Sequence, residues 1–229
     1  MRKNGIIIAI DGPAGAGKTS VGKAVAEKIA YRFISTGKMY RAIAWLCKQE
    51  CVDVSNEKEV VELAKKNPIS FVENNSVELD VEIAGIRLDR ELYLEEIADA
   101  TSAVAKLKDL REFFVEEQRR IGRDGGIVME GRDITTNVFP DAELKIYLDA
   151  SPQARAERRV RQLESKGIKA DYNEILSMIL KRDHQDSTRK ENPLLKSSDS
   201  IYIDTTSMSQ QEVVNLIVNL YKQKIDSKI

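Results

Sequence analysis

The segment "IIIAIDGPAGAGKTS", Ile6–Ser20, decides the fold of this chain. It begins with the β-branched apolar run Ile6–Ile10, which is typical of a buried parallel strand. Glycines, a lysine and two hydroxyl residues follow, and Lys18–Tyr31 then places apolar residues at helical spacing. The segment therefore predicts a strand, a glycine-rich turn and a helix in direct succession.

The turn matches the pattern G-x-x-x-x-G-K-[ST] in full and is interpreted as a P-loop. Glycines let the backbone direct its N–H groups at phosphate oxygens, and the helix directs its positive end at the same anion. Lys18 is expected to neutralise the β and γ phosphates, and Thr19 to ligate Mg²⁺. The residues expected to bind ATP are Gly12, Pro13, Ala14, Gly15, Ala16, Gly17, Lys18, Thr19 and Ser20.

A P-loop alone does not determine whether the terminal phosphate of the nucleotide is hydrolysed, controls a conformational switch or is transferred to an acceptor molecule. A GTPase switch would carry D-x-x-G and N-K-x-D, and the sequence contains neither. Its single histidine, His184, argues against Ser-His-Asp and Cys-His hydrolysis. Motor and nucleic-acid ATPases are usually larger and more basic. Transfer to a small acceptor is therefore favoured over a plain ATPase or a switch.

The composition of the chain limits the kinds of molecule that it is expected to bind. The 229 residues include 36 Lys plus Arg and 37 Asp plus Glu, so a net charge of −1 gives no general attraction to nucleic acid. Cys47 and Cys51 are interpreted as semi-buried thiols, since a metal site needs more ligands. The N-terminal apolar run is too short for a signal peptide, and no stretch could span a membrane. We expect a cytoplasmic protein without nucleic-acid or membrane partners.

Short strands alternate with helices along the chain, which predicts an α/β fold with a parallel sheet covered on both faces. The further expected strands are Phe33–Ile34, Ile127–Met129, Leu144–Leu148 and Ile201–Ile203. The expected helices between them are Met39–Glu50, Leu107–Ile121, Pro152–Lys166, Tyr172–Asp183 and Gln210–Lys224. We expect a three-layer P-loop NTPase fold with about five parallel strands.

Two segments interrupt this alternation. Ile69–Leu88 alternates apolar and polar residues, with turn residues at Asn74-Asn75 and Gly85, and predicts a small antiparallel sheet before a helix over Glu91–Val104.

The second such segment, Ser151–Arg189, is helical and highly charged, and Arg155, Arg158, Arg159 and Arg161 lie close together in it. A charge run of this kind is ordinarily a solvated helix face. Its functional interpretation is a lid that closes over the triphosphate.

Two further motifs follow predicted strands, at the sheet edge where open α/β folds bind ligands. "STGKMYR" places Arg41 one turn into a helix, where its guanidinium can bind a phosphate through two hydrogen bonds. "MEGRDITT" turns at Gly131 and directs Arg132 and Asp133 into the same cleft. The motifs predict an anionic acceptor. A phosphate acceptor is mostly dianionic at neutral pH, so its attack needs no general base.

The chain resembles the bacterial cytidylate kinase family from the P-loop to the C-terminus. "IDGPAGAGK", "TGKMYR", "ATSAVA…LR", "EGRD", "DASPQARAERR" and "RDHQDSTR" occur in the family's order and at similar spacing, together with the family's long insertion after the second strand. The resemblance implies a monomeric, Mg²⁺-dependent enzyme of pyrimidine nucleotide metabolism that phosphorylates CMP or dCMP with ATP.

The resemblance also implies roles for individual residues. Lys18, Arg132, Arg155 and Arg159 would be catalytic, and Arg158 would bind ATP. The acceptor's phosphate would be held by Thr36, Arg41, Arg132 and Arg189, with Gly37 beside them. Ser102, Arg111 and Asp133 would read cytosine, and Arg182 and Asp186 would lie near the sugar. The implied regions are a core over 1–65, 105–150 and 190–229, a monophosphate-binding insertion over 66–104 and a helical lid over 151–189.

The chain departs from the family at two positions. Ser35 stands where the family often has Asp, and Lys38 where it often has Ala. Since "STG" is closer to the adenylate kinase pattern, these two positions are candidates for altered acceptor selectivity. The glycine-phenylalanine-proline-arginine loop of adenylate kinases is absent, and "EGRD" stands in its region. An AMP or UMP kinase, or a P-loop ATPase that is not a kinase, remains the alternative at this point.

Overall fold

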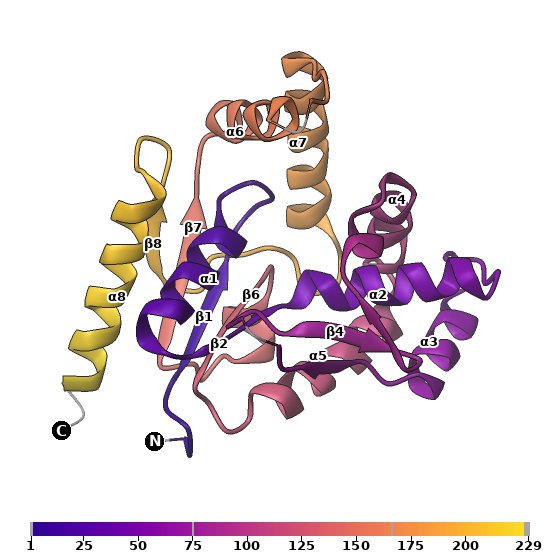
Figure 1. Cartoon of the computed structure of the whole chain (residues 1–229), viewed down its shortest axis with the longest axis horizontal. Coiled ribbons are helices and arrows are strands. Elements are labelled where there is room, and N and C mark those ends of the chain that lie inside the picture. The colour runs from indigo at the N-terminus through magenta and orange to yellow at the C-terminus, as the bar shows by residue number, and fades with distance from the viewer. Residues whose placement is uncertain (1, 75, 166, 227–229) are drawn as a thin grey trace.

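The computed structural model describes residues 2–74, 76–165 and 167–226. Its larger sheet has the strand order β2-β6-β1-β7-β8, and every pair in it is parallel (Figure 1). The strands are β1 (Ile7–Asp11), β2 (Arg32–Ser35), β6 (Ile127–Gly131), β7 (Leu144–Asp149) and β8 (Ile201–Asp204). The predicted parallel sheet is confirmed, with each strand within two residues of its predicted ends.

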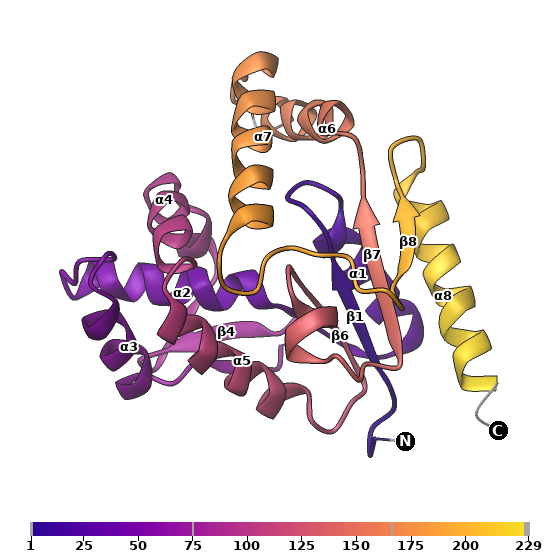
Figure 2. The same cartoon turned by 180° about the vertical axis from the view of Figure 1, so that it is seen from behind.

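Alternation of side chains along the central strand builds the three layers. Ile8 and Ile10 enter a cluster with α1 (Lys18–Ile29) and α8 (Gln210–Asp226) on one face of the sheet. Ile7 and Ala9 enter a second cluster with α5 (Lys108–Gly122) and the short helix η2 (Ile134–Val138) on the other face (Figure 2). Both faces are buried, which explains why β1 is apolar throughout.

The insertion contains the predicted antiparallel sheet, formed by β3 (Ser70–Val72), β4 (Asp80–Ile83) and β5 (Ile86–Leu88). The predicted turn at Gly85 joins β4 to β5, and its φ of +74° explains the glycine. Asn75, in the other predicted turn, lies outside the described residues.

Four helices pack on this small sheet in one hydrophobic cluster. They are α2 (Thr36–Gln49), α3 (Glu57–Lys66), α4 (Glu95–Val104) and the start of α5. The sequence analysis did not predict α3. The predicted helix over Glu91–Val104 is wrong at its start, because the chain forms a single turn, η1 (Arg90–Tyr93), and Leu94 is extended before α4 begins.

The segment predicted as a lid forms α6 (Pro152–Glu164) and α7 (Tyr172–Thr188), which pack on each other beyond the carboxyl ends of the strands (Figure 1). Ser151 begins α6 by accepting a hydrogen bond from Ala154 N, and Asp171 begins α7 in the same way. The predicted end of the first helix, Lys166, lies outside the described residues. No α7 side chain is fully buried. In the described part of the chain, no helix is long and apolar enough to cross a membrane.

Candidate active site

The P-loop lies between β1 and α1 at the carboxyl edge of the sheet. Gly12 has φ +150°, and a Cβ there would lie 1.9 Å from the carbonyl oxygen of Leu148, so only glycine lets the loop pass β7. Gly17 begins α1 in the left-handed conformation at φ +91°. Buried Lys18 donates from Nζ to the carbonyl oxygen of Pro13 at 2.8 Å. The loop is thus folded around the position predicted for phosphate.

The charge of Lys18 depends on its surroundings. Burial, together with the charge of neighbouring Arg132, lowers the pKa of Lys18 to about 7, although Glu130, Asp11 and Asp186 act in the opposite direction. An anion beside Nζ would favour the charged form and raise this pKa. The site is therefore prepared for a polyanion, whose binding stabilises the ammonium group.

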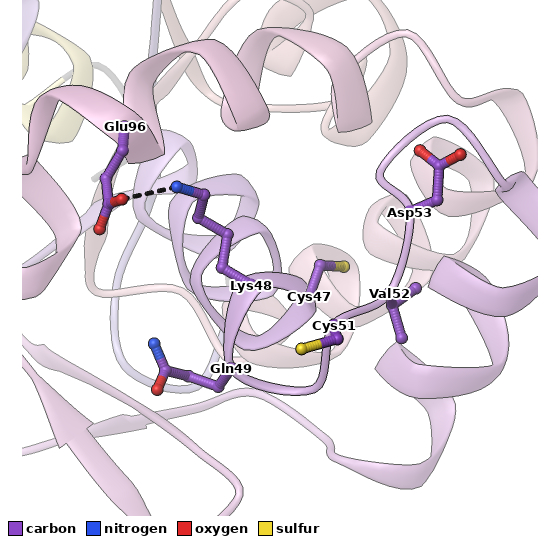
Figure 3. A pocket seen from close by; sticks show the side chains of 7 residues that line it. All are labelled: Cys47, Lys48, Gln49, Cys51, Val52, Asp53 and Glu96. Carbon is purple, nitrogen blue, oxygen red and sulfur yellow. Dashed lines mark hydrogen bonds and ion pairs between the residues drawn. The ribbon is translucent and has the colours of Figure 1, made fainter.

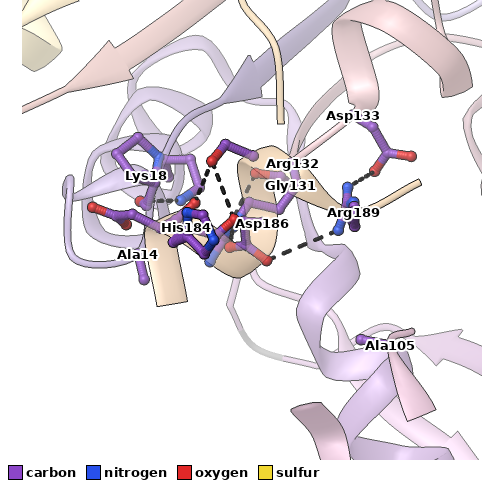
Figure 4. A network of polar contacts seen from close by, with 12 residues as sticks. Ala14, Lys18, Ala105, Gly131, Arg132, Asp133, His184, Asp186 and Arg189 are labelled. Atoms are coloured by element: carbon purple, nitrogen blue, oxygen red, sulfur yellow. Dashed lines mark hydrogen bonds and ion pairs between the residues drawn. The ribbon is translucent and has the colours of Figure 1, made fainter. Parts of the chain in front are cut away.

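A network of guanidinium and carboxylate groups lies beside the P-loop (Figure 4). Arg132 Nε donates to Asp186 Oδ2 at 2.8 Å, and Arg111 NH2 donates to Asp133 Oδ2 at 2.7 Å. Arg189 lies between the two pairs, 3.7 Å from Asp133 Oδ1 and 3.9 Å from Asp186 Oδ1. The network joins β6, α5 and the end of α7, which are far apart in sequence.

Two nitrogens of this network are buried without a hydrogen-bond partner, namely Arg111 Nε and Arg189 NH2. An unsatisfied buried donor costs about 1–3 kcal/mol, so proteins rarely retain one without a reason. Both belong to residues predicted to bind the acceptor. These two donors are available to an acceptor that the protein itself does not supply.

Further arginines make the surroundings of this network positive. Arg41 NH1 donates to the carbonyl oxygen of Leu92 at 2.8 Å, and its guanidinium lies over the Tyr93 ring. Burial lowers the pKa of Arg41, and the nearby Arg159 adds to this effect. Burial also lowers the pKa of Arg182, with a further contribution from Arg132. This mutual repulsion favours an anionic ligand over a neutral one.

The arginines of α6 have different surroundings. Arg155 is buried, forms two hydrogen bonds with Asp183 at 2.5 and 3.0 Å, and donates to the carbonyl oxygen of Ala14 at 3.0 Å. It thereby ties α6 to α7 and to the P-loop. Arg158 donates to the hydroxyl and carbonyl oxygens of Thr205. The solvated-face alternative is therefore wrong for these two residues, whereas the contact of Arg159 is with Gln162 on the exposed side of α6.

The structure does not bring every predicted residue into this network. Ser102 donates its hydroxyl to the carbonyl oxygen of Ala98 in its own helix, 3.1 Å away. Thr36 is buried and donates to the carbonyl oxygen of Glu130 at 2.9 Å, and Gly37 follows it on the exposed side of α2.

Two buried acids were missed by the sequence analysis. Glu130 Oε1 accepts hydrogen bonds from Ser35 Oγ at 2.5 Å and Thr19 Oγ1 at 3.2 Å. Asp11 accepts from Ile134 N, Thr135 N and Thr135 Oγ1 at 2.7–2.9 Å, and burial raises its pKa to about 6. Asp11 is the last residue of β1 and Glu130 the last but one of β6, and each precedes a glycine, a signal that the sequence did contain.

The oxygen ligands at this edge fit Mg²⁺. Thr19 and Glu130 bring a hydroxyl and a carboxylate together, and Mg²⁺ prefers few protein oxygens with substrate phosphates and water completing its shell. Among the described residues, no group of three or more His, Cys, Asp or Glu could hold a metal by itself.

A second hollow lies at the opposite end of α2 (Figure 3). It is lined by Cys47, Lys48, Gln49, Cys51, Val52, Asp53 and Glu96. Cys47 is buried and Cys51 exposed, and burial raises the pKa of Cys47 to about 11, so its thiol stays protonated. Thr36 lies about 20 Å away along the helix, so this hollow is separate from the P-loop site.

Fold and site together define a P-loop nucleotide-binding protein in which a network of guanidinium and carboxylate groups lies beside the P-loop. The profile of the family "Cytidylate kinase" matches residues 8–223. The chain therefore belongs to the cytidylate kinase family.

Named relatives agree with this assignment. The chain is 42% identical to the cytidylate kinase of Clostridioides difficile, over 93% of this chain and 97% of that protein. It is 43% identical to the cytidylate kinase of Bacillus subtilis, over 95% and 96% of the two chains. It is also 45% identical to a bifunctional pantoate ligase/cytidylate kinase of Prochlorococcus marinus, of which it spans 44%. An uncharacterized protein from Eubacterium ventriosum shares the fold, with a TM-score of 0.50 at 14% identity, covering 95% of this chain and 98% of that one.

Proposed function

We propose that the chain transfers the γ-phosphate of ATP to CMP or dCMP, giving ADP and CDP or dCDP. The observation that carries this proposal is the buried Arg111–Asp133 pair beside the P-loop, with Arg111 Nε left without a partner. A carboxylate and an adjacent guanidinium are complementary to the polar edge of cytosine. Family membership supports the same activity.

Phosphoryl transfer between two polyanions depends on positioning and charge rather than on a base. Lys18 and the P-loop would hold the β and γ phosphates, and Arg158 would bind ATP where it meets Thr205. Arg41, Arg132 and Arg189 would hold the acceptor phosphate, with Thr36 and Gly37 at the start of α2. The acceptor oxygen is already ionised, so these cations lower the barrier by offsetting the repulsion on approach.

Cytosine presents an amino donor at its 4-position, where uracil presents a carbonyl acceptor. Asp133 would accept from that amino group, and Arg111 would donate to the ring nitrogen and the 2-carbonyl. Ser102 would join them only after a rotation away from Ala98. Arg182 and Asp186 would lie near the sugar.

Thr19 would hold Mg²⁺ together with the triphosphate, and the ion would offset charge on the β and γ phosphates. Arg155 and Arg159, in the lid over 151–189, would complete the site when α6 and α7 close and exclude water. The core would span 1–65, 105–150 and 190–229, and the monophosphate-binding insertion 66–104. A monomeric state, a cytoplasmic location, a role in pyrimidine nucleotide metabolism and the absence of nucleic-acid partners stay predictions.

A coupled assay that measures ADP release with MgATP and CMP, dCMP, UMP, AMP or GMP tests the proposal. We expect efficient turnover with CMP and dCMP, and slow ADP release when no acceptor is present. Comparable efficiency with AMP or UMP would contradict the proposed base recognition. Acceptor-independent ADP release at the same rate would indicate a plain ATPase.

A further inference from the structure

The carboxylate proposed to read cytosine has one engaged and one free oxygen. Asp133 Oδ2 accepts from Arg111 NH2 at 2.7 Å and from Asn137 Nδ2 at 3.3 Å. Oδ1 lies 3.7 Å from Arg189 NH2 and accepts no hydrogen bond from any residue that the structure describes (Figure 4). A carboxylate only accepts hydrogen bonds, so Oδ1 is the oxygen left for a donor such as the amino group of cytosine. The two hydrogen bonds on Oδ2 therefore determine which oxygen stays free.

Asn137 lies in the wide turn η2 that follows Asp133. In this turn Val138 N donates to the carbonyl oxygen of Asp133, and Phe139 N donates to that of Ile134, five residues apart in each case. The side chain of Asn137 is half-buried and directs its amide nitrogen at the Asp133 carboxylate. The opposite orientation of the amide would place two acceptors together, which is unfavourable. Asn137 thus fixes the rotation of the carboxylate with a donor that the base does not use.

The position of Asn137 is itself fixed from α5. Arg119 NH2 donates to the carbonyl oxygen of Asn137 at 2.7 Å, and Arg119 Nε donates to that of Val138 at 3.1 Å. Arg111 lies about two turns earlier in the same helix. One helix therefore holds both ends of this segment, with Arg111 at Asp133 and Arg119 at the last residues of η2.

We propose that Asn137 is a positioning residue for the choice of acceptor base. Its side-chain amide, held in place by Arg119, orients Asp133 so that one carboxylate oxygen faces the base, and this raises the preference for a base with an amino group over one with a carbonyl group. The inference deepens the proposed function and rests on it, because it requires Asp133 to read the base.

Steady-state kinetics of the full chain with CMP and with UMP, under saturating MgATP, measure this role. Asn137→Leu removes the donor at similar side-chain size. The net contribution of one hydrogen bond corresponds to roughly 3–10-fold in an equilibrium constant, so the CMP-to-UMP ratio of kcat/KM should fall by about that factor. The loss should lie in the KM for CMP, with kcat nearly unchanged, because the base contact exists before as well as during phosphoryl transfer.

A second substitution separates hydrogen bonding from packing. Asn137→Asp keeps the shape of the side chain, but at pH 8 two carboxylates would then repel each other and the donor to Asp133 would be lost. The CMP-to-UMP ratio should therefore fall further than in Asn137→Leu. If Asn137 served only to fill space, the isosteric Asn137→Asp would have the smaller effect.

Arg119 supplies a further variant, which keeps the test open if Asn137→Leu does not fold. Arg119→Met should lower the CMP-to-UMP ratio in the same direction but by less, because Asp11 also holds the start of η2. The matched control is Arg120→Met, the next residue of α5, whose guanidinium pairs with Glu117 in its own helix. This control should leave the ratio unchanged. Thermal unfolding identifies the variants that are folded at the assay temperature.

Two outcomes would overturn the inference. If Asn137→Leu and Asn137→Asp lower Tm but leave the CMP-to-UMP ratio unchanged, Asn137 only stabilises η2. If kcat falls equally with CMP and UMP, the substitutions disturb the whole turn, including the adjacent Arg132. Failure of the proposed function would appear separately, in the wild-type chain, as the absence of CMP phosphorylation or of a preference for CMP, and the inference would fall with it.

Discussion

Substitution of Asp133 by Asn tests base recognition and fold stability at once. Asp133 accepts from Arg111 NH2 at 2.7 Å and from Asn137 Nδ2 at 3.3 Å, and its other oxygen lies 3.7 Å from Arg189 NH2. The Asn side chain has nearly the same shape and keeps one carbonyl acceptor, so little volume changes. The perturbation is therefore mainly the loss of one negative charge beside the buried Arg111 and the half-buried Arg189.

The expected effect on stability follows from that pair. A hydrogen bond to a charged group contributes about 1.5–3 kcal/mol, and Asn retains part of it, so we expect a loss of about 1–3 kcal/mol. For a chain of this size that corresponds to a decrease in Tm of roughly 2–4 °C per kcal/mol. The folded state should therefore persist at the assay temperature.

The expected effect on activity differs between the two bases. CMP loses its charged acceptor, so its kcat/KM should fall by about 10–100-fold, equivalent to about 1.4–2.7 kcal/mol. UMP should be affected little, because the Asn amide can rotate and donate to the uracil carbonyl. The CMP-to-UMP ratio should narrow mainly through the loss with CMP.

The assay is ADP release with CMP and with UMP under saturating MgATP, accompanied by thermal unfolding of each variant. Asp141→Asn is the control, because Asp141 is an exposed carboxylate paired with Arg2. A lower Tm with an unchanged CMP-to-UMP ratio would refute base reading by Asp133. Its role would then be limited to the ion pair with Arg111.

Three further predictions follow from the P-loop and its support. Lys18→Ala should reduce turnover by thousands-fold, because loss of a cation in a water-poor site raises the activation free energy by several kcal/mol. A folded variant with more than about a tenth of wild-type turnover would contradict this prediction. Without bound ATP, the pKa of Lys18 is about 7, below its ordinary value, so ATP binding near pH 8 should be accompanied by uptake of a proton. Calorimetry in two buffers of different ionisation enthalpy measures this uptake. A binding heat that is the same in both buffers would contradict the prediction. Asp11→Ala should lower the free energy of unfolding by roughly 3–5 kcal/mol, because it leaves three buried donors on Ile134 and Thr135 without an acceptor. Urea unfolding measures this change. A decrease below about 1 kcal/mol would mean that water replaces the carboxylate.

Features that depend on residues close together in the sequence could be predicted from it. The P-loop and the five parallel strands are local patterns, and each formed where its pattern lies. The helix α3 was also predictable in principle, because Asn56 begins it and its side chain accepts from Glu59 N. Its apolar face covers the insertion rather than the main sheet, so the strand–helix alternation gave no reason to expect it.

Features that depend on contacts between residues far apart in the sequence could not be predicted in this way. From the sequence, Glu130 is only a polar residue near the end of a predicted strand. The fold brings Thr19, which lies 111 positions earlier, to its carboxylate. Arg155 belongs to a charge run that predicts exposure, yet Asp183 on the next helix neutralises it and lets it be buried. Such burial needs a paired charge in the right geometry, and sequence spacing alone does not supply that geometry.

The two departures from the family pattern take on a different meaning in the fold. Ser35 contacts Glu130, and Lys38 Nζ lies 2.5 Å from Glu78 Oε1, where residue 78 pairs with Phe33 at the edge of the main sheet. Lys38 therefore ties the first turn of α2 to the base of the insertion. Neither side chain contacts Arg111 or Asp133 in the described structure, and an effect of these departures on acceptor selectivity stays a prediction. Ser35 thus contacts an acid at the end of β6 and Lys38 holds the insertion, while the pair proposed to read cytosine, Arg111 and Asp133, is contacted by neither.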